Sequence, residues 1–191
     1  VFLDISLTSV SLGKLIIQLF SHTVPKTAEN FRQLCMGDPS KGELTFKNCR
    51  FHSIVAEVMM SSGDITHGDG TGGMSIYGPS FADESLQLKA IPHVGPGIVT
   101  MVNTGRDSNN SQFAVTLGRA EWLDGTCVVV GKVVEGLPLL NMVAQRCENP
   151  HTHSVDYTPL CKRQRSQRQF DFKAFYGANL ITRPPASGGH E

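Results

Sequence analysis

Hydrophobic and polar residues alternate at the start of the chain. Among residues 1–8 every odd position is apolar, and three of the four even positions are polar. A period of two residues is typical of a strand with one buried face, so this segment predicts a half-buried strand. The apolar run KLIIQLF (14–20) follows a short segment that contains glycine. Together the two runs predict a β-hairpin.

Two later segments have the period of a helix. Between Pro25 and Met36 apolar residues recur three or four positions apart, and Gly37 follows the last of them. Proline suits the first helical turn, and glycine suits the left-handed residue that ends a helix. The same spacing recurs from Leu137 to Cys147, with a proline at the second position. Both segments therefore predict α-helices.

Short apolar runs between these helices predict further strands. Glycine-rich segments separate the runs. A mainly β chain with two helices and six or more short strands predicts a closed barrel with helical plugs, because closure removes exposed strand edges. The runs are Phe51–Met60, Ile98–Val102, Phe113–Thr116 and Cys127–Val134.

The length of 191 residues suits one compact domain, which we place at residues 1–163. After Arg163 the composition becomes basic, then aromatic, then typical of disorder, so residues 164–191 are predicted to be a C-terminal extension that is partly disordered or docked on a partner. Residues 162–191 carry six basic and two acidic residues in a chain of zero net charge, so the body is mildly acidic. The aromatic residues of the extension are expected to pack on this domain or on a partner: Phe170, Phe172, Phe175 and Tyr176.

Cysteine content and charge bear on the surroundings of the protein. Five widely spaced cysteines, an odd number, disfavour a disulfide framework and favour an intracellular, reducing compartment. No stretch approaches the roughly 20 apolar residues of a membrane span, so no membrane contact is expected. A net charge of zero provides no field that would steer the chain to nucleic acid. The chain begins with Val and not Met, which favours a piece of a longer protein.

Three motifs suggest chemistry but are better explained as structure. GDGTGG (68–73) has the glycine spacing of a dinucleotide-binding loop, yet no helix pattern follows it and Asp69 would repel phosphate, which favours a surface loop. His52 and Ser53 are neighbours on a predicted strand and point to opposite faces, so they cannot pair as base and nucleophile. The basic run KRQRSQR (162–168) is typical of a solvated segment or a docking element, with nuclear targeting or nucleic-acid contact as the alternative.

One further group could be considered for metal binding. Its members are spaced like no common zinc site, and a proline among them indicates a loop. We therefore predict no metal site and no cofactor. The residues are Cys147, His151, His153 and Cys161.

Several motifs in order along the chain resemble one family. They are VPKTAENFRQLC, FHSIV, GTGGMSIYGPSFADE, GPGIVTMVNTG, NNSQFAVTL and AEWLDGTCVVVGKVVEG. Over about 160 residues the chain resembles the cyclophilin family of peptidyl-prolyl cis-trans isomerases. The resemblance implies an eight-stranded antiparallel closed β-barrel capped by two α-helices.

The same resemblance exposes a missing catalytic group. The family lowers the ~18–20 kcal/mol barrier to rotation about the peptide bond that precedes proline. It uses an arginine immediately after Phe-His, which hydrogen-bonds the prolyl nitrogen and carbonyl region. Here Phe51 and His52 are followed by Ser53. The catalytic arginine is absent, and no residue is assigned a catalytic role.

The resemblance also implies a peptide-binding groove, in which an apolar pocket grips the proline ring. Five of its positions differ from the family pattern: Val58, Ser61, Val102, Ala114 and Cys127. The other five are retained: Met59, Asn103, Gln112, Trp122 and Leu123.

These substitutions predict a cyclophilin-type domain that is catalytically impaired or inactive. It would act as a protein-binding or structural module within a larger assembly, with proteins or Xaa-Pro segments as partners. The alternative is a weakly active isomerase that assists protein folding. In the family Trp122 corresponds to a residue that contacts cyclosporin, and the altered neighbouring positions predict weak or absent binding of that drug.

Overall fold

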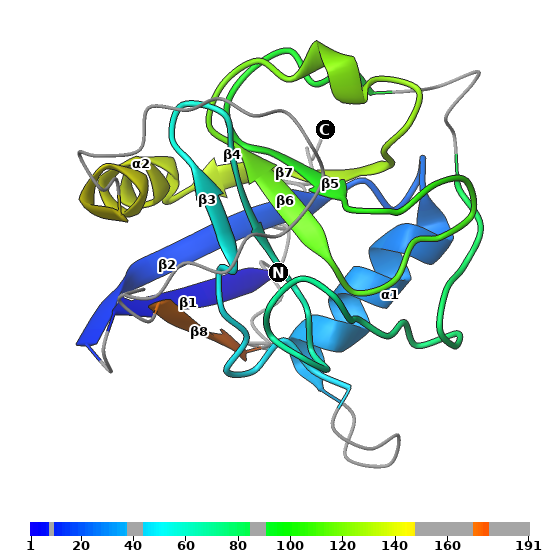
Figure 1. Cartoon of the computed structure of the whole chain (residues 1–191), viewed down its shortest axis with the longest axis horizontal. Helices are drawn as coiled ribbons and strands as arrows, with labels where there is room; N and C mark the ends of the chain where they lie inside the picture. Colours follow the sequence, from blue (N-terminus) through cyan, green and yellow to red (C-terminus); the bar gives the residue numbers. More distant parts are fainter. Residues whose placement is uncertain (8–9, 38–43, 85–90, 148–169, 176–191) are drawn as a thin grey trace, which may run out of the picture.

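The computed structural model describes residues 1–7, 10–37, 44–84, 91–147 and 170–175. Its strands form one eight-stranded antiparallel sheet in the order β3-β4-β6-β5-β7-β2-β1-β8, which curves around the core (Figure 1). The strands are β1 (Phe2–Leu7), β2 (Val10–Leu19), β3 (Ser53–Val55), β4 (Met59–Ser62), β5 (Ile98–Met101), β6 (Phe113–Thr116), β7 (Val129–Glu135) and β8 (Phe170–Phe175).

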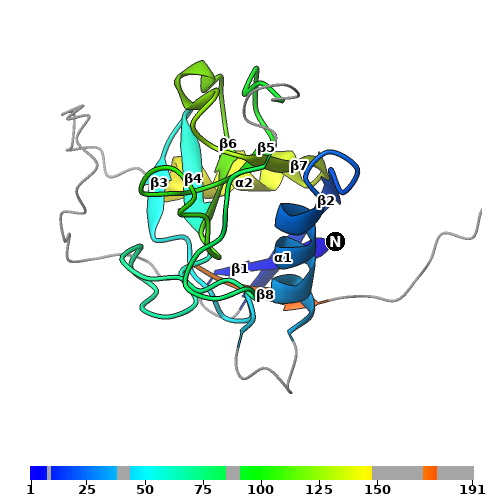
Figure 2. The same cartoon turned by 90° about the vertical axis from the view of Figure 1, so that its right-hand side faces the viewer.

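Two α-helices cover this sheet from opposite sides (Figures 1 and 2). They are α1 (Pro25–Met36) and α2 (Leu137–Cys147), and both lie where the sequence predicts them. A short 3₁₀ helix, η2 (Glu121–Leu123), precedes β7. The prediction of a mainly β protein with two helices is confirmed.

Closure of the barrel is not confirmed. Among the described strands no ladder joins β3 to β8, so the sheet has two ends. β8 belongs to the segment predicted as a C-terminal extension, and its backbone pairs with β1 from Phe2 opposite Phe175 to Leu7 opposite Phe170. The proposed domain boundary at residue 163 and the aromatic residue Tyr176 lie outside the described residues.

The apolar run Phe51–Met60 is two strands rather than one. β3 and β4 pair with each other, with Ile54 opposite Met60. The turn between them contains Glu57 at a φ of 61°, a left-handed conformation that reverses the chain. A glutamate at this position gives no turn signal, because glycine and asparagine are the residues expected there.

An aromatic cluster holds the centre of the core. Phe31 of α1, Phe46 and Phe113 of β6 are fully buried, and their ring centroids lie 5.0 to 5.2 Å apart in tilted or edge-on geometry. This arrangement is favourable for aromatic rings beyond the area that they bury. It anchors α1 against the inner face of the strands that carry the candidate site.

The N-terminus of α1 is capped from a distant loop. Val24 precedes the helix and offers no capping side chain. Glu84 instead accepts hydrogen bonds from the backbone N–H groups of Lys26 and Thr27, at 3.1 and 2.6 Å, and from the Thr27 hydroxyl at 2.7 Å. A carboxylate at this end also suits the helix dipole.

Candidate functional site

Four small residues form a row on the outer face of the sheet. Ser53 of β3 lies opposite Ser61 of β4, which lies opposite Ala114 of β6, which lies opposite Thr100 of β5. Directly opposed residues of an antiparallel ladder share one face. This outer row therefore brings the serine at the family's arginine position into line with Ser61 and Ala114, as the predicted groove requires.

The exposure of the row falls from β3 to β5. Ser53 is exposed and Ser61 half-buried, whereas Ala114 and Thr100 are each 1% exposed. A second outward row lies two residues further along the strands, with Val55 opposite Met59 and Met59 opposite Thr116. The accessible part of this face is thus its β3–β4 side.

A loop carries Trp122 to the end of β5. Val102 follows β5 and donates its N–H to the carbonyl of Gln112 at 3.0 Å. The Asn103 side chain donates to the Thr126 carbonyl at 2.7 Å, and the Cys127 N–H donates to the Leu123 carbonyl at 3.0 Å. These bonds place the predicted groove residues Asn103, Leu123 and Cys127 side by side.

Trp122 itself is exposed over 54% of its surface. No residue of η2 is buried, so the indole ring stands on the surface of the protein. Trp122 is therefore not part of the core, and its indole ring presents apolar area and an N–H donor at the surface.

Gln112 lies beneath a loop. Its side chain is 7% exposed, and its amide nitrogen donates to the carbonyls of Gly70 and Gly72 at 3.0 and 2.7 Å. An amide group has two hydrogens, and both are used here. The side-chain oxygen is therefore the part of Gln112 that can meet a ligand.

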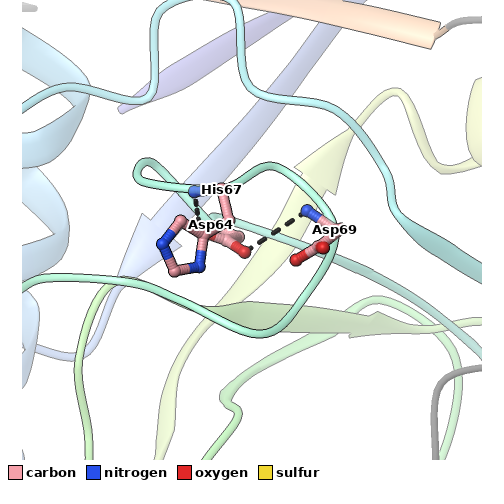
Figure 3. Close-up of side chains that lie close together, drawn as sticks. All are labelled: Asp64, His67 and Asp69. Carbon is pink, nitrogen blue, oxygen red and sulfur yellow. Dashed lines mark hydrogen bonds between the residues drawn. The ribbon is translucent and has the colours of Figure 1, made fainter.

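The loop above Gln112 is organised by Asp64, which sequence analysis did not select. The carboxylate is 3% exposed. Two of its bonds, from the backbone N–H groups of His67 and Asp69, are drawn in Figure 3. Further hydrogen bonds come from the Thr66 N–H, the Thr66 hydroxyl, Gly70 N–H and Gly72 N–H, all between 2.9 and 3.1 Å.

The ionised form of Asp64 is strongly favoured. Burial raises the pKa of its carboxyl, but the hydrogen bonds from His67, Gly72 and Thr66 outweigh burial and hold the pKa well below its usual range. GDGTGG (68–73) is therefore a loop folded around a charge. No helix follows it, which confirms the prediction of a loop and excludes the dinucleotide geometry.

Asp64, His67 and Asp69 also offer ligand atoms within 4.8 Å of one another. Each, however, already has a partner inside the loop. Asp69 accepts from the N–H and hydroxyl of Thr71 at 3.0 and 2.6 Å, and His67 Nδ1 lies 3.0 Å from the Thr71 hydroxyl. The cluster fits a hydrogen-bonded loop, because the carboxylate lone pairs of Asp64 are occupied by N–H and O–H donors.

The imidazole ring of His52 packs against this loop. A Cβ atom on Gly70 would lie 2.9 Å from His52 Nδ1, so the ring lies against the glycine. Burial lowers the pKa of His52, and its Nε2 is buried without a hydrogen-bond partner in the described residues. The prediction that His52 and Ser53 do not act as a base and nucleophile agrees with this placement.

The remaining candidates do not form a site in the described residues. His151, His153 and Cys161 lie outside them. Cys35, Cys49 and Cys127 are free thiols, and burial raises the pKa of both Cys35 and Cys49 to about 12. In the described part of the chain neither helix has the length and hydropathy that crossing a membrane requires.

Comparison with known proteins agrees with this geometry. Residues 2–160 match the family model described as cyclophilin type peptidyl-prolyl cis-trans isomerase/CLD. The chain is also 41% identical over 154 residues to peptidyl-prolyl cis-trans isomerase 11 of Caenorhabditis elegans, covering 80% of each protein. The chain belongs to the cyclophilin-type peptidyl-prolyl isomerase family.

Proposed function

We propose that this cyclophilin-type domain binds proline-containing segments of other proteins on the outer row and Trp122, and isomerises them weakly or not at all. Its role would be that of a binding module within a larger assembly. The observation that carries the proposal is the exposed Ser53 in a row of uncharged side chains, at the position where the family has its arginine.

The size of the expected loss follows from the missing charge. A guanidinium at this position would stabilise the twisted amide by hydrogen bonds to the prolyl nitrogen and carbonyl region. The hydroxyl of Ser53 is neutral and several ångströms shorter. Removing a preorganised electrostatic donor typically costs ~2.7–4 kcal/mol, or about 10²–10³ in rate.

Binding of the proline ring would also be weaker. The family's pocket phenylalanine is replaced by Ala114, whose side chain is 1% exposed and offers little surface to a ligand. Loss of an aromatic wall removes about 1–3 kcal/mol of apolar contact. Met59 and Trp122 remain accessible, which supports binding that is weakened but retained.

The second candidate is a weakly active isomerase that assists protein folding. It is supported by the 41% identity to a protein named as a peptidyl-prolyl cis-trans isomerase. In that case a neighbouring cation such as Arg50 or Arg106 would supply the missing charge. Both residues are exposed.

Exchange NMR on an Ala-Pro peptide distinguishes the two candidates. We expect the wild-type chain to shift the peptide resonances with little added cis/trans exchange. Ser53→Arg should raise the exchange rate at least about tenfold, since it restores part of the electrostatic term. Ser11→Arg, an exposed serine on β2, is the matched control and should change nothing.

The outcomes separate cleanly. Rapid exchange with the wild-type chain would make it an isomerase and contradict the proposed impairment. No shift of any peptide resonance would contradict proline binding. Calorimetry with cyclosporin gives an independent check, since submicromolar affinity would mean that the altered positions leave the family's drug site intact.

We also propose an intracellular, reducing location. The free thiols of Cys35, Cys49 and Cys127 support it.

A further inference from the structure

Two acidic side chains flank Trp122 at one end of the predicted groove. Ser53 and the ten predicted groove residues are all uncharged. Trp122 is preceded by Glu121 and followed, two residues later, by Asp124, and all three side chains are exposed.

Asp124 is held in place by a buried histidine. Its Oδ1 accepts the backbone N–H of His93 at 2.9 Å and lies 2.7 Å from His93 Nδ1, while the histidine side chain is fully buried. Nothing among the described residues donates to Oδ2 of Asp124. The hydrogen bonds from the side chain and backbone of His93 lower the pKa of Asp124, which keeps the carboxylate ionised at neutral pH.

Among the described residues the Glu121 side chain pairs with Arg119, and this ion pair is exposed. Arg119 Nε lies 2.8 Å from Glu121 Oε1, but the two side chains are 72% and 51% exposed. Ion pairs this exposed are readily replaced by water or by another cation. The segment around Trp122 therefore presents two carboxylates and one weakly held cation.

An exposed indole ring flanked by carboxylates is a favourable site for a positively charged side chain. The ring face attracts cations, and the neighbouring carboxylates add Coulomb attraction. We infer that the Trp122 end of the groove selects proline segments of partner proteins that carry arginine or lysine immediately before the proline. The inference rests on the proposed function, because it presupposes that the groove binds proline.

Three capped peptides that differ only in the residue before proline test this specificity. With Ala-Ala-Xaa-Pro-Ala-Ala, we expect the arginine peptide to bind about fivefold more tightly than the alanine peptide, and the glutamate peptide more weakly than both. The preference should shrink when salt is raised, because exposed charges are screened. Calorimetry gives the affinities, and NMR shifts of the Trp122 indole N–H locate the contact.

Variants of the full chain assign the preference to its residues. Glu121→Gln and Asp124→Asn should each reduce the ratio of arginine to alanine affinities about twofold, and Trp122→Leu should reduce it further. Glu135→Gln, an exposed glutamate of β7, is the matched control and should leave the ratio unchanged. Because Asp124→Asn also alters the partner of His93, its melting temperature is measured alongside, and Glu121→Gln tests the charge without touching that pair.

The results distinguish the inference from the proposed function. Equal binding of the three peptides would overturn the inference and leave proline binding standing. An arginine preference that keeps its wild-type size in both Glu121→Gln and Asp124→Asn would also overturn it. If no proline peptide binds at all, the proposed function and the inference fail together.

Discussion

The two faces of the sheet formed by β4, β6 and β5 differ sharply. The inner face carries the rows Ser62–Phe113–Met101 and Met60–Val115–Val99, and all six residues are fully buried. The outer row carries Ser61, Ala114 and Thr100. Five of the six inner side chains are apolar, with Ser62 the exception, whereas the outer row of Ser61, Ala114 and Thr100 holds small uncharged ones.

This difference separates the requirements of folding from those of chemistry. The inner face is needed for any stable version of the fold, because it packs against the aromatic cluster of Phe31, Phe46 and Phe113. In the outer row Ala114 and Thr100 are also buried, so Ser53 and Ser61 at its accessible end are the residues that folding constrains least. A chain can therefore keep its membership of an enzyme family while the side chains that define the enzyme change.

The largest expected effect is on the inner face. Phe113→Ala removes a ring that touches two others in a closely packed core, and we expect it to lower the free energy of unfolding by about 3–5 kcal/mol. Urea unfolding followed by far-UV circular dichroism measures the change. Ser61→Ala, in the adjoining outer row, is the control, and a similar loss there would remove the distinction between the faces.

The second largest effect on the free energy of unfolding is expected in the loop around Asp64. Asp64→Asn removes the charge that five backbone N–H groups and one hydroxyl share, and turns an amide NH₂ group toward those donors. Since hydrogen bonds to a charged group contribute about 1.5–3 kcal/mol, we expect a loss of roughly 2–4 kcal/mol in the free energy of unfolding. Thermal and urea unfolding measure it.

Asp69→Asn is the matched control in the same loop. Asp69 is exposed and accepts hydrogen bonds from the N–H and hydroxyl of Thr71. Its substitution should change the melting temperature far less. Equal losses for the two variants would mean that charge in the loop, and not the network around Asp64, sets stability.

The contribution of Asp64 should also depend on pH. Its pKa in the folded protein is depressed, so the stabilisation is fully present above the unfolded pKa of about 3.9 and is lost as pH falls toward the folded value. The difference in the free energy of unfolding between wild type and Asp64→Asn should therefore be constant from about pH 5 to about pH 8 and shrink below about pH 4. A difference that instead grows on acidification would contradict the assigned direction.

The smallest expected effect is in the outer row. Ser53 is exposed on a three-residue strand, so Ser53→Ala should change the free energy of unfolding by less than about 0.5 kcal/mol. It should also leave the exchange rate of a bound Ala-Pro peptide unchanged if the hydroxyl has no catalytic role. A clear fall in exchange would show that Ser53 takes part in the chemistry.

The sequence predicted the regular elements better than the loops. Proline, glycine and apolar spacing place both helices correctly, because these signals act locally. The split of Phe51–Met60 was missed, since the left-handed Glu57 has no sequence signature. The strand at Phe170–Phe175 was assigned to an extension, although Phe170 and Phe172 alternate with charged residues as strand residues do.

For the candidate site, too, the residues on strands were predicted and the contacts made by loops were not. The resemblance supplied the outer row, Trp122 and the missing arginine, and the strand register brings the row together. The resemblance did not reveal that the amide group of Gln112 donates both of its hydrogens to carbonyls of the 68–73 loop. The role of Asp64 was equally hidden, because its donors converge only once residues such as Gly70, at a φ of 91°, adopt the left-handed conformation.

The pairing of β8 with β1 has a consequence for the newly synthesised chain. Leu7 is synthesised 163 residues before its partner Phe170. At synthesis rates of about 5–20 residues per second, this edge of β1 stays unpaired for roughly 8–30 s before β8 is made. An open edge can pair with other chains during that interval. The nascent protein is therefore exposed to misassembly, and to chaperone capture, along β1.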